Sequence, residues 1–340
     1  MKFGRIIYGY NPTEGKHQKA NLGDAIQTFA VDGLYRYMGI PEGDVLNVRR
    51  TELSSYSGEK VVLPFQGCFI NTNGAPIFPV SENIVPEYFG FCSSTRKDKK
   101  YISEMPENKV IGCRDEHVWR YLRDCKKNVY LTGCLTATFP RRENEGDTVF
   151  LVDAPAETKD VMPKELLKKT EKLSQSFDMK GMTVDESYEK VERATRKQLS
   201  ILKERASLVV TSRLHVASPC VAMGIPVILF RKYFDDRYEW IDKFIPLYTL
   251  DKASEIDWSP TPPEYEDIKK LMFDTAGAVI REDENGKELA AELHAVFMDR
   301  NRCLTKKPFY VKAYHSVIKA APKTANFLRE VVLKKYTAET

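Results

Sequence analysis

The sequence predicts an α/β protein of two halves, each built on a parallel sheet, with a cleft between them. Its 340 residues suit two domains, because domains usually contain roughly 100–200 residues. Short strand-like runs alternate with amphipathic helical stretches, a pattern typical of parallel sheets covered by helices on both faces. A charged, turn-rich break at 140–147 interrupts this alternation, which then restarts.

The first half begins with a strand expected at 6–10 and a polar loop that continues to residue 20. From Gly23 onward, apolar residues recur at intervals of three and four, which predicts an amphipathic helix that ends near Gly39. These elements open an N-terminal domain expected at 1–140. Its further strands are expected at 44–48, 60–63, 67–71, 110–113 and 128–131, and a second helix at 115–125.

The second half repeats the alternation. Strands are expected at 148–152, 206–210, 226–230 and 246–250, and helices at 163–176, 184–205, 264–275 and 285–300. We therefore expect a C-terminal domain at 141–300, followed by a basic helical tail at 301–340.

Composition narrows the class of protein. The chain is 42% hydrophobic and 29% charged, as in an ordinary globular protein with a core. Its seven cysteines form no C-x-x-C pair and are odd in number, which favours a reducing, cytoplasmic location. The five histidines lack zinc-ligand spacing, so no metal is expected. No apolar leader and no long uncharged apolar run occur, so neither a signal peptide nor a membrane span is expected.

The net charge of +4 is unevenly distributed. Residues 301–340 contain nine Lys and Arg against two Glu, a balance of +7 that leaves −3 for residues 1–300. Such a tail is either a solvated helical face or a contact with an anionic surface, including the inner face of a membrane. Nucleic acid is not expected as a partner.

The segment T-S-R-L-H at 211–215 follows an expected strand and precedes a helix. The segment therefore lies at the carboxyl edge of the predicted parallel sheet, which is where open α/β folds bind their ligands. The helix N-terminus there attracts phosphate or carboxylate. Ser212 is a candidate N-cap, Arg213 can hold an oxyanion through two hydrogen bonds, and His215 can exchange protons near neutral pH. The alternative is that Arg213 and His215 only cap and pack the turn.

The segment I-G-C-R-D-E-H at 111–117 also reads as strand, turn and helix. Asp115 and Glu116 fall at a helix N-terminus, where acidic residues are favoured. Arg114 is a cation at the positive end of that dipole and needs a partner, which a bound anion would supply. His117 is expected on the surface or in the core.

The segment N-L-G-D-A-I-Q at 21–27 leads into the first helix. Gly23 permits close approach of the backbone, Asn21 or Asp24 can cap the helix, and Gln27 lies one turn further on. The segment lacks the G-x-G-x-x-G spacing of a dinucleotide site. Its polar residues either bind a substrate or only cap.

Two further turns follow expected strands. Gly133 indicates a tight turn at the cleft. Apart from a possible helix N-terminus, Cys134 has no sequence neighbour that would activate it as a nucleophile. Arg231 and Lys232 place cations after the strand at 226–230, unless this segment is simply a solvated loop.

Taken together and in order, these motifs resemble the polysaccharide pyruvyl transferase family. The matching elements are N-x-G-D at 21–24, G-C-R-D at 112–115, G-C-L-T at 133–136, and S-R-L-H at 212–215 followed by A-M-G-I-P at 222–226. The resemblance spans roughly residues 1–250. It implies two Rossmann-like domains that face a cleft, similar to the B-type glycosyltransferases, with the acceptor on the N-terminal side and Arg114 contributing to the cleft.

The resemblance implies that the enolpyruvyl group of phosphoenolpyruvate is moved onto two hydroxyls of one sugar. The products are a cyclic pyruvate ketal and phosphate. Arg114 matches the family's arginine for phosphoenolpyruvate, His215 matches its histidine, and a third cation matches either Arg231 or Lys232. The saccharide is part of a polysaccharide or its precursor, lipid-linked or free, and no cofactor or metal is required.

His215 is the candidate acid that protonates the methylene carbon, since a bound anion would keep its imidazolium charged. Asp24 and Asp115 are the candidate bases that deprotonate the incoming hydroxyl. The other candidate contacts to substrate are Asn21, Gly23, Gln27, Gly133, Ser212 and Arg213.

Two other functions are compatible with the motifs. A nucleotide-sugar glycosyltransferase of the same architecture could use the same cations to hold a diphosphate. A non-catalytic relative could only bind glycans, although the presence of both Arg114 and His215 argues against it.

Overall fold

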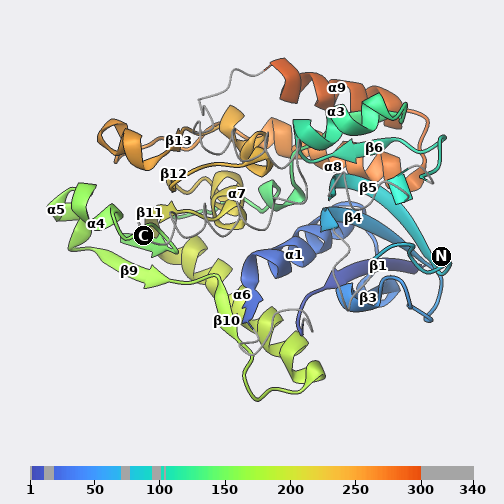
Figure 1. Cartoon of the computed structure of the whole chain (residues 1–340), viewed down its shortest axis with the longest axis horizontal. Helices are drawn as coiled ribbons and strands as arrows, with labels where there is room; N and C mark the ends of the chain where they lie inside the picture. The colour runs from blue at the N-terminus through green and yellow to red at the C-terminus, as the bar shows by residue number, and fades with distance from the viewer. Residues whose placement is uncertain (1, 11–18, 70–76, 94–100, 103–104, 300–340) are drawn as a thin grey trace, which may run out of the picture.

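The computed structural model describes residues 2–10, 19–69, 77–93, 101–102 and 105–299, and these form an α/β fold with two parallel sheets (Figure 1). The predicted tail at 301–340 lies outside the described residues. In each sheet, several of the described crossovers between strands carry helices, as the alternation in the sequence predicts. The α/β class is therefore confirmed.

The first sheet has six strands in the order β3-β1-β4-β5-β6-β7, all parallel. Numbered by their own sequence order, these strands run 2-1-3-4-5-6, so the direction of winding changes between β1 and β4. A change of this kind opens a crevice at the carboxyl edge of a sheet. The strands are β1 (Lys2–Ile7), β3 (Val45–Arg49), β4 (Val61–Phe69), β5 (Ile84–Ser93), β6 (Ile111–Cys113) and β7 (Val129–Leu131).

Several strand predictions in this sheet are wrong. The strand expected at 6–10 is β1, which begins at Lys2 and ends at Ile7. The strands expected at 60–63 and 67–71 are one strand, β4, whose pairing with β5 shifts register between Phe65 and Gly67. The long strand β5 was not predicted, because Pro86 and Glu87 lie inside it and argue against a central strand. The sheet accommodates them because β6 pairs with β5 only at Phe91, which leaves the first half of β5 unpaired on that side.

The second sheet has five parallel strands in the order β13-β12-β11-β8-β9. Numbered by their own sequence order they run 5-4-3-1-2, so the winding changes between β8 and β11, and a second crevice opens there. The predicted strands at 148–152, 206–210, 226–230 and 246–250 are confirmed. They are β8 (Thr148–Val152), β11 (Ala206–Thr211), β12 (Val227–Phe230) and β13 (Leu247–Tyr248).

The helix predicted at 163–176 is wrong. The chain forms two single-turn helices, α4 (Thr158–Val161) and α5 (Lys164–Leu167), and then β9 (Thr170–Leu173) and β10 (Ser176–Asp178). β9 is an edge strand whose two central residues are exposed. Such a strand needs no continuous apolar run, which is the signal that sequence reading relies on.

Helices α1 (Leu22–Tyr37) and α7 (Leu214–Met223) lie between the two sheets and contact each other, and α1 also packs against α6 (Val184–Arg205) (Figure 1). The helix predicted to end near Gly39 and the one predicted at 184–205 are confirmed. Buried residues of both sheets belong to one continuous apolar core. The 3-10 helices are η1 (Glu42–Asp44), η2 (Arg50–Glu52), η3 (Leu135–Ala137), η4 (Asp236–Tyr238), η5 (Ile241–Lys243) and η6 (Leu250–Glu255).

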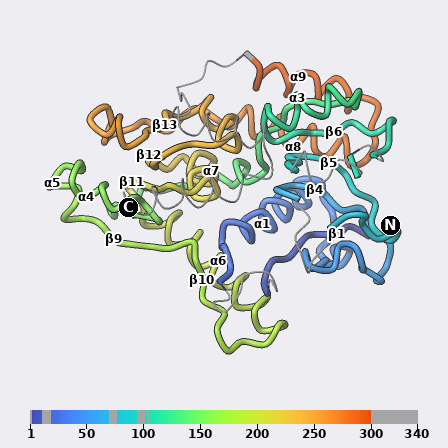
Figure 2. Tube along the Cα trace, viewed as in Figure 1, coloured from blue at the N-terminus to red at the C-terminus, as the bar shows by residue number. Residues whose placement is uncertain are grey.

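The last two described helices, α8 (Glu266–Arg281) and α9 (Gly286–Asp299), follow the second sheet in sequence but pack against the first. Figure 2 traces α9 beside α3 (Glu116–Asp124), and the rings of Trp119 and His294 lie 5.2 Å apart. His294 Nδ1 also accepts a hydrogen bond from the backbone N–H of Leu131, at 3.1 Å. The domain boundaries at 140 and 300 stay predictions.

A short antiparallel pair joins segments from opposite halves of the sequence. β2 (Lys19–Asn21) pairs with β10, with Asn21 opposite Ser176. The backbone N–H of Leu22 donates to the carbonyl oxygen of Gln175 at 2.8 Å. The start of α1 is thereby tied to the segment that follows β9.

Within the described ranges, no helix is long and apolar enough to cross a membrane. The six described cysteines are free, and no cluster of His, Cys, Asp or Glu among these residues could hold a metal ion.

Candidate active site

A cavity of about 420 Å³ lies at the carboxyl edges of both sheets. The first sheet contributes residues after β1, β3 and β6 and from the end of β4, and the second contributes residues after β9, β11 and β12. Both crevices predicted from the strand orders therefore open into the same cavity. Its charged lining residues are Asp24, Arg50, Arg114, Arg213, Arg231 and Arg237.

Arg114 follows β6 and lies in the wall of this cavity, with only 2% of its surface exposed. Its Nε is 3.8 Å from an Asp115 carboxylate oxygen, and among the described residues neither Nε nor Nη2 has a hydrogen-bond partner. Burial opposes its charge, but the thiols of Cys92 and Cys68 and the Asp115 carboxyl raise the pKa of Arg114 above its ordinary value. A charged guanidinium with unfilled N–H groups is costly to bury, so the site favours an anion there.

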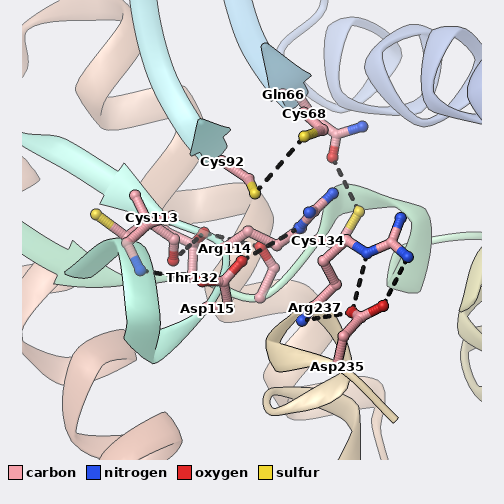
Figure 3. A network of polar contacts seen from close by, with 12 residues as sticks. Gln66, Cys68, Cys92, Cys113, Arg114, Asp115, Thr132, Cys134, Asp235 and Arg237 are labelled. Carbon is pink, nitrogen blue, oxygen red and sulfur yellow. Dashed lines mark hydrogen bonds and ion pairs between the residues drawn. The ribbon is translucent and has the colours of Figure 1, made fainter. Parts of the chain in front are cut away.

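Arg237 belongs to η4, and Figure 3 shows it near Arg114 but on a different segment of the chain. Its Nε and Nη2 donate to the Asp235 carboxylate at 2.9 and 2.7 Å. This hydrogen bonding raises the pKa of Arg237, although Arg114 repels it. Sequence reading considered 230–237 as a cationic turn but did not select Arg237.

Arg231 lines the cavity and Lys232 does not. The Arg231 guanidinium donates to the Tyr238 hydroxyl and, at 3.4 Å, to the Ser212 carbonyl oxygen. Arg50, which sequence reading missed, follows β3 and donates to the Cys68 carbonyl oxygen at 2.9 Å. The signal for Arg50 was its position two residues after the strand predicted at 44–48.

His215 lines the cavity from the first turn of α7, where a hydrogen bond links it to the backbone of Gly23. Burial, and then the charges of Arg114 and Arg237, lower the pKa of His215 to about 3. The imidazole is therefore neutral near pH 7 while the cavity holds no anion. A Cβ on Gly23 would lie 3.1 Å from the His215 Cβ, so a larger residue at this position would press on His215.

The two candidate carboxylates have different surroundings. Asp24 lines the cavity, and burial raises its pKa against the opposing charge of Arg50. Asp115 is buried as the N-cap of α3, where it accepts a hydrogen bond from the Val118 N–H at 3.1 Å. The predicted capping role of Asp115 is confirmed, and it does not line the cavity.

The prediction that Ser212 is the N-cap of the helix after β11 is wrong. Ser212 does not cap α7: its hydroxyl donates to the Asp153 carbonyl oxygen at 2.6 Å. Arg213 is the N-cap residue, and its Nε lies 2.9 Å from the Asp153 carboxylate. Ser212 and Arg213 both line the cavity, but Arg213 is already paired.

Asn21 and Gln27 line the cavity from the first turns of α1. The Asn21 side chain caps the helix by accepting from the Gly23 N–H at 3.1 Å. Gln27 Oε1 accepts from the Gln66 amide at 3.4 Å. Gly133 does not line the cavity: a Cβ there would lie 2.7 Å from the Phe297 ring, so packing requires this glycine.

Three cysteines surround Arg114 (Figure 3). Cys134 is fully buried, and burial raises its pKa, which disfavours a nucleophilic role. Cys68 lines the cavity, and its Sγ is 3.9 Å from that of Cys92 on the neighbouring strand. The hydrogen bond from Cys92 lowers the pKa of Cys68 to about 7.

Fold and cavity together define an α/β protein with a cationic pocket at the edges of two parallel sheets. The family model described as polysaccharide pyruvyl transferase matches residues 21–231, which is more than half of the chain. The chain belongs to the polysaccharide pyruvyl transferase family.

No curated protein matches the chain. Among solved structures, a functionally uncharacterized protein from Klebsiella pneumoniae shares 18% sequence identity. The match covers 67% of this chain and 83% of that chain, with a TM-score of 0.37, and at this level it supports no inference about the present fold.

Proposed function

We propose that the protein transfers the pyruvyl group of phosphoenolpyruvate to two hydroxyls of one sugar, forming a cyclic ketal and releasing phosphate. The buried guanidinium of Arg114, with two N–H groups unfilled by any described residue, is the observation that carries the proposal. Phosphoenolpyruvate has a phosphate, at about −1.5 to −2, and a carboxylate. Both are planar or forked acceptors of the kind that arginine binds.

Several cations support the binding of this anion. Arg231 and Arg237 line the same cavity as Arg114. Each charge-assisted hydrogen bond contributes about 1.5–3 kcal/mol net, so three or four are sufficient for micromolar affinity. These arginines supply the positive charge in the proposed reaction, which includes no metal or cofactor.

His215 is the proposed acid. Its pKa of about 3 in the free protein means that it must gain a proton when phosphoenolpyruvate binds. Raising the pKa to near 7 requires about 5 kcal/mol. One negative charge about 4 Å away contributes about 4 kcal/mol at an effective dielectric constant of about 20, so an anion with a phosphate and a carboxylate, which carries more than two charges, is sufficient.

In the proposed reaction, His215 protonates the methylene carbon, and one sugar hydroxyl attacks the resulting cationic carbon. Phosphate then leaves, and the second hydroxyl closes the ketal. One hydroxyl proton restores the imidazolium and the other leaves with phosphate, so atoms and charges balance. Asp24 is the favoured base, because it lines the cavity with a raised pKa, whereas Asp115 does not line it.

We also propose that the two sheets belong to two Rossmann-like domains arranged as in the B-type glycosyltransferases. Two parallel sheets that share one cavity at their carboxyl edges support this arrangement. A cytoplasmic location, and contact of the tail at 301–340 with an anionic membrane, are parts of the same proposal.

The function is tested by incubating the protein with phosphoenolpyruvate and a panel of galactose, glucose and mannosamine acceptors. We expect phosphate release that depends on one acceptor, and a gain in mass of that acceptor by one pyruvyl ketal. Absence of turnover on every acceptor, together with no calorimetric binding of phosphoenolpyruvate, would contradict the proposal.

Proton uptake should accompany the binding of phosphoenolpyruvate. The pKa of His215 is about 3 without the anion, so its imidazole should take up a proton when phosphoenolpyruvate binds at pH 7. Affinity should then fall as pH rises through the pKa in the complex, since the protonated form binds more tightly. Calorimetry in buffers of different ionisation enthalpy measures the uptake.

The variant His215→Ala is the control for this measurement, because the phosphate also titrates near neutral pH. Uptake by the wild type should exceed uptake by the variant by a substantial fraction of one proton. Equal values for both proteins would show that His215 stays neutral.

A further inference from the structure

The cavity contains a buried amide that the steps described above do not use. Gln175 follows β9 and lines the cavity, with 1% of its surface exposed. Among the described residues, neither its Nε2 nor its Oε1 has a hydrogen-bond partner. A buried amide left unsatisfied on both atoms is unfavourable, because each atom has lost its hydrogen bonds to water, so this position favours a ligand.

The backbone of Gln175 is held firmly, so the amide is not free to turn away with its loop. Its N–H donates to the Asp153 carboxylate at 3.1 Å, and its carbonyl oxygen accepts from the Leu22 N–H at 2.8 Å. The next residue pairs with Asn21 in the β2–β10 ladder. The amide is therefore presented from the junction of the two halves.

The chemistry of the amide selects the ligand. An amide offers both donor and acceptor atoms, and a partner must accept from one and donate to the other. The carboxylate and phosphate of phosphoenolpyruvate almost only accept near neutral pH, so they leave Oε1 unfilled. Neighbouring sugar hydroxyls donate and accept at once, and they satisfy both atoms whichever way the amide is turned.

We infer that Gln175 binds a hydroxyl pair of the saccharide acceptor and marks the acceptor side of the cavity. The inference rests on the proposed function, which supplies a sugar as the second substrate. Asp24 lies on the same side of the cavity as Gln175. Its carboxyl forms a hydrogen bond with Asn21, and it comes two residues after Leu22, whose N–H binds the Gln175 carbonyl oxygen. A hydroxyl held by Gln175 therefore lies in the region of the proposed base, with Arg114 and His215 left for phosphoenolpyruvate.

This placement extends the prediction that the N-terminal domain at 1–140 is the acceptor side. β9, which Gln175 follows, belongs to the second sheet, while Asn21 and Asp24 come from the first half of the sequence. The acceptor subsite is thus formed by both halves, through the β2–β10 pair.

The test compares the wild type with Gln175→Leu, which keeps the side-chain size and removes both polar atoms. The control is Gln198→Leu on α6, a buried glutamine that does not line the cavity. Methyl glycosides of galactose, glucose and mannosamine are the probes, and saturation-transfer NMR titrations measure their binding. Calorimetry with phosphoenolpyruvate is run on every variant, and Gln175→Met is a second apolar replacement.

We expect the wild type and Gln198→Leu to bind at least one glycoside with similar affinity. Gln175→Leu and Gln175→Met should bind it about tenfold or more weakly, while their affinity for phosphoenolpyruvate stays within about twofold of wild type. In turnover, the same variants should raise KM for the acceptor and leave KM for phosphoenolpyruvate nearly unchanged.

The outcomes separate the two proposals. Equal glycoside binding by the wild type and both Gln175 variants overturns the subsite, as does a wild type that binds phosphoenolpyruvate but no glycoside. Glycoside binding that depends on Gln175, in a protein that does not bind phosphoenolpyruvate, supports the subsite and contradicts the pyruvyl transfer.

Discussion

Replacement of Arg114 by glutamine is expected to weaken the binding of phosphoenolpyruvate by about 100-fold or more. The guanidinium offers two N–H groups that no described residue fills, and two charge-assisted hydrogen bonds contribute about 3–6 kcal/mol. Glutamine keeps much of the length of the side chain but loses the charge. Isothermal titration calorimetry of the purified variant measures the change.

The control for this variant is Arg120→Gln. Arg120 lies on the exposed side of α3, where it pairs with Glu116, and it does not line the cavity. Its replacement should leave the affinity for phosphoenolpyruvate unchanged. Equal affinity of Arg114→Gln and the wild type would show that the anion binds elsewhere.

The same replacement is also expected to lower the stability of the free protein. Neighbouring groups, including the Asp115 carboxyl, raise the pKa of Arg114, so its charge is stabilised in the fold. Glutamine would leave the buried Asp115 without its nearby cation, which is unfavourable. Denaturant unfolding without ligand measures the change, and an unchanged free energy of unfolding would show that the contact with Asp115 adds no stability.

The variant His215→Ala is expected to lose turnover by about 10²–10⁴-fold, the usual contribution of general acid catalysis. Binding of phosphoenolpyruvate should be largely retained, because His215 is neutral in the free cavity and the arginines supply the attraction. Phosphate release at saturating phosphoenolpyruvate and acceptor measures kcat. A loss confined to kcat would mark a group that acts on the transition state.

His117→Ala is the matched control for the histidine. His117 lies on α3 with about half of its side chain exposed, 3.8 Å from an Asp236 carboxylate oxygen, and does not line the cavity. Turnover by this variant should match the wild type. If His215→Ala also retained full turnover, the proton would have to come from another group.

Local pattern predicted those parts of the fold that local physics controls. The helix from Asn21 has a capping side chain followed by apolar residues at helical spacing, and α6 has a complete capping box, so both were readable. β5 was missed because it contains a proline, which is tolerated where β6 does not pair with it. β9 was missed because its centre is polar, which is tolerated at the edge of a sheet. Both tolerances are properties of the sheet and not of the segment.

Many of the cavity residues could be predicted because they lie in turns after strands that the sequence pattern predicts. Arg114, Arg213, Arg231 and His215 were each selected from segments in which a strand leads into a turn, and the cavity brings all four together. Asp115, Lys232 and Gly133 were selected by the same rule and do not line it. A position after a strand places a residue at the carboxyl edge of the sheet. Whether its side chain then points into the cavity depends on what packs beside it.

By itself, then, the sequence determined the α/β class, most of the helices and strands, and the set of turns from which a site could be built. These follow from turn chemistry and periodicity, which act over a few residues. Only the tertiary structure decided that Arg50, Arg237 and Gln175 share one cavity with them, that Asp24 and not Asp115 faces it, and that His215 is uncharged until an anion arrives. Proximity and pKa depend on burial and on charges brought from distant parts of the chain, and no short segment contains that information.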